Sequence, residues 1–128
     1  MALPGGTVAG ACEGALAKEF SAIGSTGKIG ELELQKLGGA SQQSFDTSLG
    51  LRIIDQLVGG VANESKVGYQ TLTASNRLQI LKDVELMQTR EVDASVWHFF
   101  TSPVTGLGGP SVPLAQFLEQ NGIQGVLH

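Results

Sequence analysis

Cysteine, charge and long apolar runs are all scarce in this chain of 128 residues. Its single cysteine, Cys12, excludes an internal disulfide and a cysteine-based zinc site, and we expect it to be a small packed residue. No apolar run approaches the roughly 18 residues of a membrane span. Residues 1–17 lack the basic start and the unbroken apolar stretch of a signal peptide. The sequence therefore predicts neither a membrane span nor a signal peptide.

Composition favours a folded chain with many short elements. Hydrophobic residues make up 41% and charged residues 16%, which excludes disorder driven by charge. Glycine, with 18 residues, is about twice as frequent as usual, so we expect many turns and helix ends. The length predicts a single domain over residues 1–128, with a flexible Gly/Pro-rich start over 1–10.

The charge balance argues mildly against a nucleic-acid partner, because twelve acidic residues outweigh eight basic ones. The basic residues are concentrated, however, and six of the eight lie between residues 28 and 82. If acidic residues in that stretch held a metal cation, the remaining face would be positive enough to meet a phosphate backbone. The six basic residues are Lys28, Lys36, Arg52, Lys66, Arg77 and Lys82.

Hydrophobic spacing and Gly/Pro breaks predict an α/β (α+β) fold, with a central mixed β-sheet flanked by helices. Gly24-Ser25-Thr26-Gly27 should separate the first two helices, and Ser111 and a threonine should cap later ones. The expected helices cover residues 11–23, 29–37, 71–88 and 111–120, and the expected strands cover 42–47, 51–58, 61–69 and 92–100.

The strongest local signal is a hairpin around Gly59-Gly60, the dipeptide favoured in a two-residue primed turn. With that turn, Asp55 stands directly opposite Glu64, and Lys66 lies diagonal to Asp55 on the same sheet face. Facing carboxylates at roughly 5 Å repel unless a cation lies between them. The alternative is a surface hairpin whose charges are solvated or form weak ion pairs.

The spacing suggests chemistry on phosphodiesters. Oxygen ligands without paired histidines suit Mg²⁺ first, with Mn²⁺ and Zn²⁺ as alternatives. Lys66 beside such a metal could stabilise a phosphate in transfer or activate an attacking water.

The series Asp55, then Glu64-Ser65-Lys66 on the next strand, resembles the PD-(D/E)xK nuclease superfamily. That pattern places an acidic residue on one strand and acidic-x-Lys on the adjacent strand, with a Glu on the preceding helix and a helix and strand following. Ile54 stands where the pattern has proline, a variation the superfamily tolerates. The resemblance covers residues 28–100 and implies a restriction-endonuclease-like core.

A narrower resemblance is to the C-terminal nuclease modules of bacterial polymorphic toxins, such as contact-dependent inhibition effectors. It rests on the runs GELEL (30–34), RIID (52–55), ESKVGY (64–69), LQILKDVEL (78–86) and WHFF (97–100). It implies a module of a longer secreted effector that acts in the cytoplasm of a target bacterium and is neutralised in the producer by an immunity protein.

The resemblance also implies roles for individual residues. Glu31, Asp55 and Glu64 would bind the metal, and Asp55, Glu64 and Lys66 would be catalytic. Gln79 and Lys82, three apart on the long helix, would project together toward substrate, although a solvated helix face is an equal alternative. Glu31 could instead be a partner of its helix dipole.

Aromatic and histidine side chains near the motif are expected to be structural. Trp97 and His98 lie in an apolar run, which favours a core tryptophan and a core or sheet-edge histidine. Packing is also the expected role of Tyr69.

The leading hypothesis is a metal-dependent endonuclease that cleaves tRNA or DNA as an antibacterial toxin module. One alternative is a non-catalytic module on the same fold that binds nucleic acid or a protein partner, which suits an acidic chain with few aromatics. Another is hydrolysis of a different phosphate ester.

Overall fold

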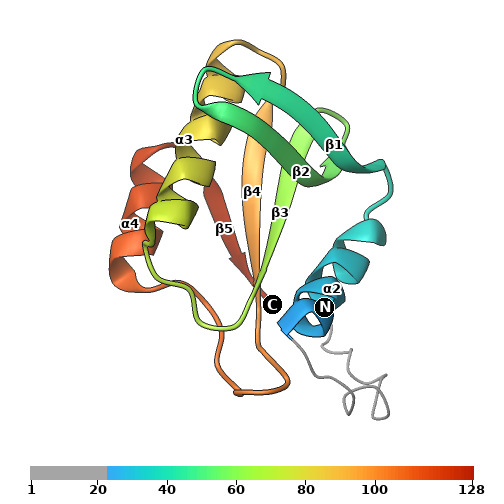
Figure 1. Cartoon of the computed structure of the whole chain (residues 1–128), viewed down its shortest axis with the longest axis vertical. Coiled ribbons are helices and arrows are strands. Elements are labelled where there is room, and N and C mark those ends of the chain that lie inside the picture. Colours follow the sequence, from blue (N-terminus) through green and yellow to red (C-terminus); the bar gives the residue numbers. More distant parts are fainter. Residues whose placement is uncertain (1–22) are drawn as a thin grey trace.

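The computed structural model describes residues 23–128, drawn in colour in Figure 1. These residues form three helices and five strands. The predicted helix over residues 11–23, the predicted flexible start and Cys12 lie outside the described residues, apart from Ile23. The helices are α2 (Ile23–Gln35), α3 (Ala74–Gln88) and α4 (Val112–Gln120); the strands are β1 (Ala40–Thr47), β2 (Gly50–Val58), β3 (Val61–Val67), β4 (Ala94–Phe100) and β5 (Gln124–Leu127).

The five strands form one mixed sheet in the order β1-β2-β3-β4-β5. β1, β2 and β3 are antiparallel neighbours, whereas β3, β4 and β5 run parallel. Figure 1 shows α2 on one side of the sheet and α3 and α4 on the other. The predicted α+β class, a mixed sheet flanked by helices, is confirmed. None of the described helices is long and apolar enough to cross a membrane.

Local signals in the sequence placed several elements correctly. Gly59 and Gly60 form the predicted two-residue turn, with positive φ angles of 54° and 84° that favour glycine. Ser111 caps α4 by accepting a hydrogen bond from the Leu114 amide at 3.3 Å. The long helix begins at Ala74, three residues later than predicted, because Thr73 is its capping threonine.

The predicted break at Gly24–Gly27 is wrong, because α2 runs through that segment from Ile23. Farther along the helix, α2 lies close against β3. A Cβ on Gly30 would stand only 2.9 Å from Val67 Cγ2 and 3.0 Å from Ser65 Cβ. Glycine at position 30 therefore lets helix and sheet approach, and the contact outweighs the low helix propensity of glycine.

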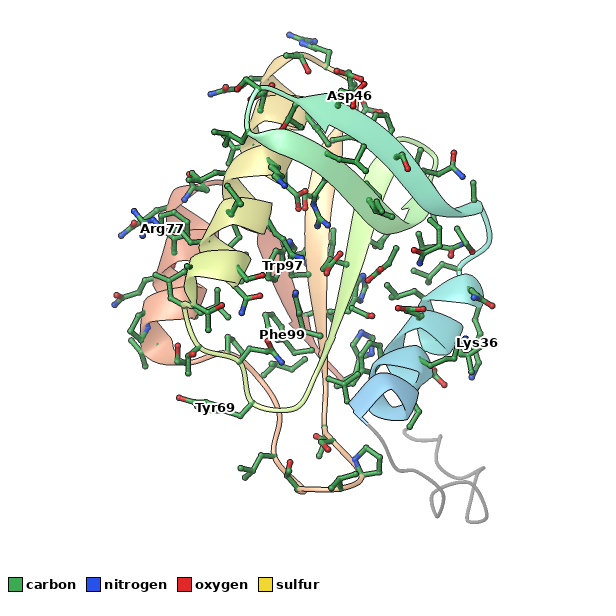
Figure 2. The ribbon with its side chains drawn as sticks, in the orientation of Figure 1. Lys36, Asp46, Tyr69, Arg77, Trp97 and Phe99 are labelled. Atoms are coloured by element: carbon green, nitrogen blue, oxygen red, sulfur yellow. The ribbon has the colours of Figure 1, made fainter. Side chains whose placement is uncertain are left out.

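The apolar core lies mainly between β4 and the helices α3 and α4. Trp97 and Phe99, labelled in Figure 2, are 0% and 1% exposed and point from β4 into this layer. The predicted core role of Trp97 is confirmed. Tyr69 does not pack as predicted, since it is 55% exposed in the connection after β3 and points outward. The buried cluster comprises Ile80, Trp97, Phe99, Leu114, Leu118 and Ile123.

Candidate functional site

The middle of β3 directs two of the predicted catalytic side chains toward α3. Residues 64 and 66 share one side of the strand because side chains alternate. The Lys66 ammonium lies 3.3 Å from Glu64 Oε2 and donates a hydrogen bond of 2.7 Å to Gln79 Oε1 on α3. The same ammonium lies 4.9 Å from the centre of the Trp97 ring. The structure thus brings together Glu64, Lys66 and Gln79, which the sequence selected.

Glu64 is also bound by an arginine that the sequence did not select. Arg52 Nη2 on β2 donates to Glu64 Oε1 at 3.1 Å, and Arg52 Nε donates to Asp83 Oδ1 at 2.7 Å. All three side chains are buried. A buried carboxylate between two cations, Arg52 and Lys66, is compensated electrostatically although water is excluded from it.

Asp83 on α3 organises the far side of this cluster. Its Oδ2 accepts hydrogen bonds from Ser95 Oγ at 2.8 Å and from Trp97 Nε1 at 3.0 Å, in addition to its contacts with Arg52. The carboxylate is only 1% exposed, so these donors replace the water it gave up. We define the ionic cluster as Arg52, Glu64, Lys66, Gln79 and Asp83.

Asp55 is not opposite Glu64, and the geometric prediction is wrong on this point. The β2–β3 pairing runs from Val58–Val61 in the predicted register but ends at Gln56–Asn63. Asp55 Oδ2 instead accepts hydrogen bonds from the Ser65 amide at 2.9 Å and the Ser65 hydroxyl at 3.2 Å. Because Ser65 alternates with Glu64, Asp55 lies on the α2 side of the sheet.

The divergence of the two strands has a physical cause. Beyond Asn63, β3 remains paired with β4 as far as Val67. The corresponding part of β2 is paired with β1 and no longer with β3. Arg52, Ile54 and Gln56 are the buried residues of β2, whereas Ile53 is 44% exposed. Lys66 therefore accompanies Glu64 but not Asp55 on one face.

Electrostatic effects still couple the three predicted metal ligands. Burial raises the pKa of Glu31, and the negative charge of Asp55 raises it further, against a smaller lowering by Lys28. Burial raises the pKa of Glu64 to about 7; Arg52 opposes this shift and Asp55 adds to it. Asp55 is thus close enough to both glutamates to disfavour their charged forms.

Carboxylates are the ligands that a hard divalent cation prefers, but the three predicted ligands are not all arranged around one point. Within residues 23–128, no three Asp, Glu, His or Cys side chains already form a metal-binding group. Asp55 Oδ1 and the Glu31 carboxylate accept no hydrogen bond from any described residue, so their oxygens are available to a cation. A cation between Glu31 and Asp55 would remove their repulsion, with waters and phosphates completing its shell.

Lys82 does not join Gln79 at the cluster. Its ammonium donates to the Leu51 carbonyl at the start of β2, at 2.9 Å. The helix spacing of three residues placed both side chains on one face correctly, but their ends reach different partners. Of the two predicted substrate-binding residues, only Gln79 therefore lies at the ionic cluster.

Sequence reasoning missed Arg52, Asp83 and the role of Ser65. Arg52 could have been suspected, because it alternates with Ile54 on the face of β2 that must be buried. Asp83 lies 31 residues from Arg52, and no local pattern pairs them. The Ser65 contact depends on the end of strand pairing, which has no sequence signature here.

A second polar group lies at the other face of β4. His98 is 8% exposed, which confirms the core or sheet-edge prediction. Its Nε2 lies 2.8 Å from Asn63 Oδ1 and its Nδ1 lies 2.8 Å from His128 Nε2. Asn63 Nδ2 donates to two backbone carbonyls, so Oδ1 is the acceptor and His98 Nε2 carries the proton. Burial lowers the pKa of both histidines, that of His98 to about 4.

Fold and site together define an α+β domain with a buried ionic cluster, and with Glu31 and Asp55 close enough to repel each other on the α2 side of the sheet. No protein-family model, curated protein or solved structure matches this chain. Any assignment of function must therefore come from the residues themselves.

Proposed function

We propose that this chain is a metal-dependent endonuclease that cleaves phosphodiester bonds of tRNA or DNA. The observation that carries the proposal is the contact between Glu64 and Lys66 on β3, with Asp55 on the adjacent strand near enough to raise the pKa of Glu64. Two acids and a lysine on neighbouring strands, next to Glu31 on a helix, are the groups that metal-assisted phosphodiester cleavage needs.

The order of elements supports a restriction-endonuclease-like core. α2, the strands β1 to β3, α3 and β4 follow one another as the PD-(D/E)xK resemblance implies for residues 28–100. The acid, acid-x-Lys series falls on β2 and β3, and Glu31 falls on the preceding helix. The order of elements is thus compatible with the pattern, although Asp55 does not stand opposite Glu64.

The mechanism assigns separate tasks to the side chains. Asp55 and Glu31 would hold the divalent ion, which would lower the pKa of a bound water and stabilise charge on the phosphate, and Glu64 would act from the other face of the sheet by holding Lys66. Lys66 would orient that water or bind a phosphate oxygen, since its ammonium has three donors. Gln79 holds the Lys66 ammonium at 2.7 Å and fixes its direction. Lys82, partly buried on α3, would touch the substrate backbone farther out.

The biological setting we propose is an antibacterial toxin module. The chain would be delivered as part of a longer secreted effector, act in the cytoplasm of a target bacterium, and be neutralised in the producer by an immunity protein. The support is the resemblance of the runs at 30–34, 52–55, 64–69, 78–86 and 97–100 to such modules. Growth arrest on induced expression, lost in Lys66→Met, would be the cellular counterpart of cleavage.

One observation favours a second candidate function, a non-catalytic module that binds nucleic acid or a protein. Glu64 is already neutralised by Arg52 and Lys66 within the protein. A carboxylate with two cationic partners can serve as a purely structural ion pair. In that case Lys66 would have no role in cleavage.

The test is cleavage of duplex DNA and of total tRNA by the purified chain, in parallel, with Mg²⁺, Mn²⁺, Zn²⁺ or EDTA. We expect one substrate to be cut, with metal required. Asp55→Asn and Lys66→Met should reduce the rate by about a hundredfold or more, since each removes a group that acts in the transition state.

Matched controls separate chemistry from folding. Asp46→Asn and Lys36→Met make the same chemical changes at exposed positions, both labelled at the periphery in Figure 2. They should cut at the wild-type rate. Thermal unfolding of every variant verifies the fold. If the folded chain cuts neither substrate, or if Lys66→Met cuts normally, the binding module becomes the better interpretation.

A further inference from the structure

The edge of the sheet at β5 has unused backbone groups. Among residues 23–128, β5 pairs with β4 alone. The His128 amide donates to the Phe99 carbonyl at 2.9 Å, so the backbone groups of residues 124, 126 and 128 face β4. Because these groups alternate along a strand, the amides and carbonyls of Gly125 and Leu127 point to the free edge.

A cleft of about 610 Å³ lies between this edge and α4. Figure 1 shows α4 beside β5 on the side of the sheet opposite α2. Phe99, Leu118 and Ile123 form its apolar base and are each at most 3% exposed in total. Gly125 and Leu127 line it as well. The same two residues thus offer hydrogen bonds at the edge and border the apolar space.

The charge that lines the cleft is negative. Glu119 on α4 is exposed and, within residues 23–128, is the only charged residue that lines it. The whole chain has a net charge of −4. A partner with a basic residue near its apolar anchor would be attracted, whereas a second copy of this acidic chain would be repelled.

We propose that the β5 edge binds an extended peptide segment of a partner protein by strand addition. The peptide backbone pairs with Gly125 and Leu127, one apolar side chain enters the cleft, and a neighbouring lysine or arginine meets Glu119. In this mode of recognition, main-chain hydrogen bonds provide affinity and the pocket provides specificity. A small apolar ligand would leave the edge groups unused. The proposal does not depend on the nuclease function.

Glycine at position 125 keeps the cleft open, and it permits a clean test. A Cβ there would lie 3.6 Å from Phe99 Cε2 and 4.0 Å from Leu118 Cδ1, which are ordinary contact distances. Gly125→Val should therefore fold, since valine also suits a strand, while its methyl groups occupy the space of the incoming side chain.

The experiment is selection of random peptides of about twelve residues displayed on phage against the full chain, followed by calorimetry with the selected synthetic peptides. We expect sequences that pair an apolar residue with a basic one. Gly125→Val should weaken their binding about tenfold or more, and Glu119→Gln should weaken it less. Amide NMR shifts on binding should be largest at Gly125 and Leu127.

Two variants serve as matched controls and should bind normally: Ser44→Val on the opposite edge strand β1, and Glu91→Gln at an exposed acid outside the cleft. The proposal is overturned if no peptide is enriched, or if selected peptides bind Gly125→Val as well as the wild type. It is also overturned if light scattering shows that Gly125→Val abolishes a dimer, because a second copy would then be the occupant.

Discussion

Two regions on the same side of the sheet are held together by different chemistry. Where α3 meets β2 and β3, several buried groups are charged, and Arg52 lies between Glu64 and Asp83 beside a smaller apolar cluster of Ile54, Ala62, Leu86 and Val92. Where α3 and α4 meet β4, the buried side chains are apolar, as in the cluster around Phe99 and Leu118. Trp97 belongs to both, because its ring packs in the apolar cluster while its Nε1 donates to Asp83.

The difference between the two regions indicates which of them we expect to carry the function. Burying several charges costs desolvation that their mutual attraction barely recovers, and apolar residues of similar volume often stabilise a fold better. The neighbouring apolar cluster shows that this sheet can be covered without charges. We therefore expect the ionic cluster to serve recognition or chemistry, as the proposed nuclease requires, and the apolar cluster to supply stability.

The largest effect should come from breaking the ionic cluster from one side. Asp83→Ala leaves Arg52 with a single carboxylate partner and removes the acceptor of Ser95 and Trp97. We expect a loss of about 3–5 kcal/mol in the free energy of unfolding, measured by urea denaturation. Asp46→Ala, at an exposed carboxylate, should change it by less than about 0.5 kcal/mol. Similar values for the two variants would contradict a buried, coupled cluster.

The apolar region should respond to truncation by a simpler rule. Leu118→Ala removes a side chain that is 2% exposed and leaves a void against Phe99 and Ile123. We expect a loss of about 2–3 kcal/mol by urea denaturation, at the low end for such changes because the neighbouring cleft lets water or side chains enter. Leu107→Ala, 58% exposed, is the control and should be nearly neutral. A larger loss than in Asp83→Ala would reverse the ranking of the two regions.

A smaller, pH-dependent effect should come from His98 on the other face of β4. Burial, then the neighbouring His128, lowers the pKa of His98 to about 4 from its ordinary 6.5. The unfolded chain therefore takes up a proton that the folded chain refuses, so stability falls as the pH falls from about 6.5 to about 4. We expect a change in the free energy of unfolding on the order of 1 kcal/mol across this window.

The measurement is urea denaturation between pH 4 and 7 for the wild type and for His98→Gln. Glu64, with its raised pKa, loses stabilisation as the pH rises from 4.5 to about 7, so the raw curve mixes opposite trends. Taking the difference between the two chains isolates His98. A difference that is flat across this window would show that the His98 ring titrates normally in the fold.

The elements that sequence predicted well have local causes. The Gly59-Gly60 turn and the Ser111 cap depend on residues within four positions of one another. β5 was missed because Gln124–Leu127 is short and owes its conformation to pairing with β4. The continuation of α2 through Gly24 was missed because the segment Gly24-Ser25-Thr26-Gly27 has a low intrinsic helix propensity.

In the candidate site too, features with local causes were predicted and features that depend on tertiary contacts were missed. Glu64, Lys66 and Gln79 were selected correctly as a group, since alternation on a strand and spacing on a helix place them locally. The facing of Asp55 and Glu64 failed because strand pairing ends after Asn63, where β4 rather than β2 directs β3. Arg52 and Asp83 are 31 residues apart and come together only in the folded chain. No short-range sequence pattern could therefore predict their contact.

The smallest effect should come from the exposed ion pair of α2, and it isolates what burial contributes. Lys36 Nζ lies 3.0 Å from Glu33 Oε2, close to the 2.7 Å between Arg52 Nε and Asp83, but the Lys36 side chain is 67% exposed and that of Arg52 only 4%. Lys36→Ala should change the free energy of unfolding by less than about 0.5 kcal/mol, and by less still in high salt. Urea denaturation at two salt concentrations measures both. If Lys36→Ala cost as much as Asp83→Ala, distance rather than burial would set the strength of ion pairs here, and the reason for placing function at the ionic cluster would be lost.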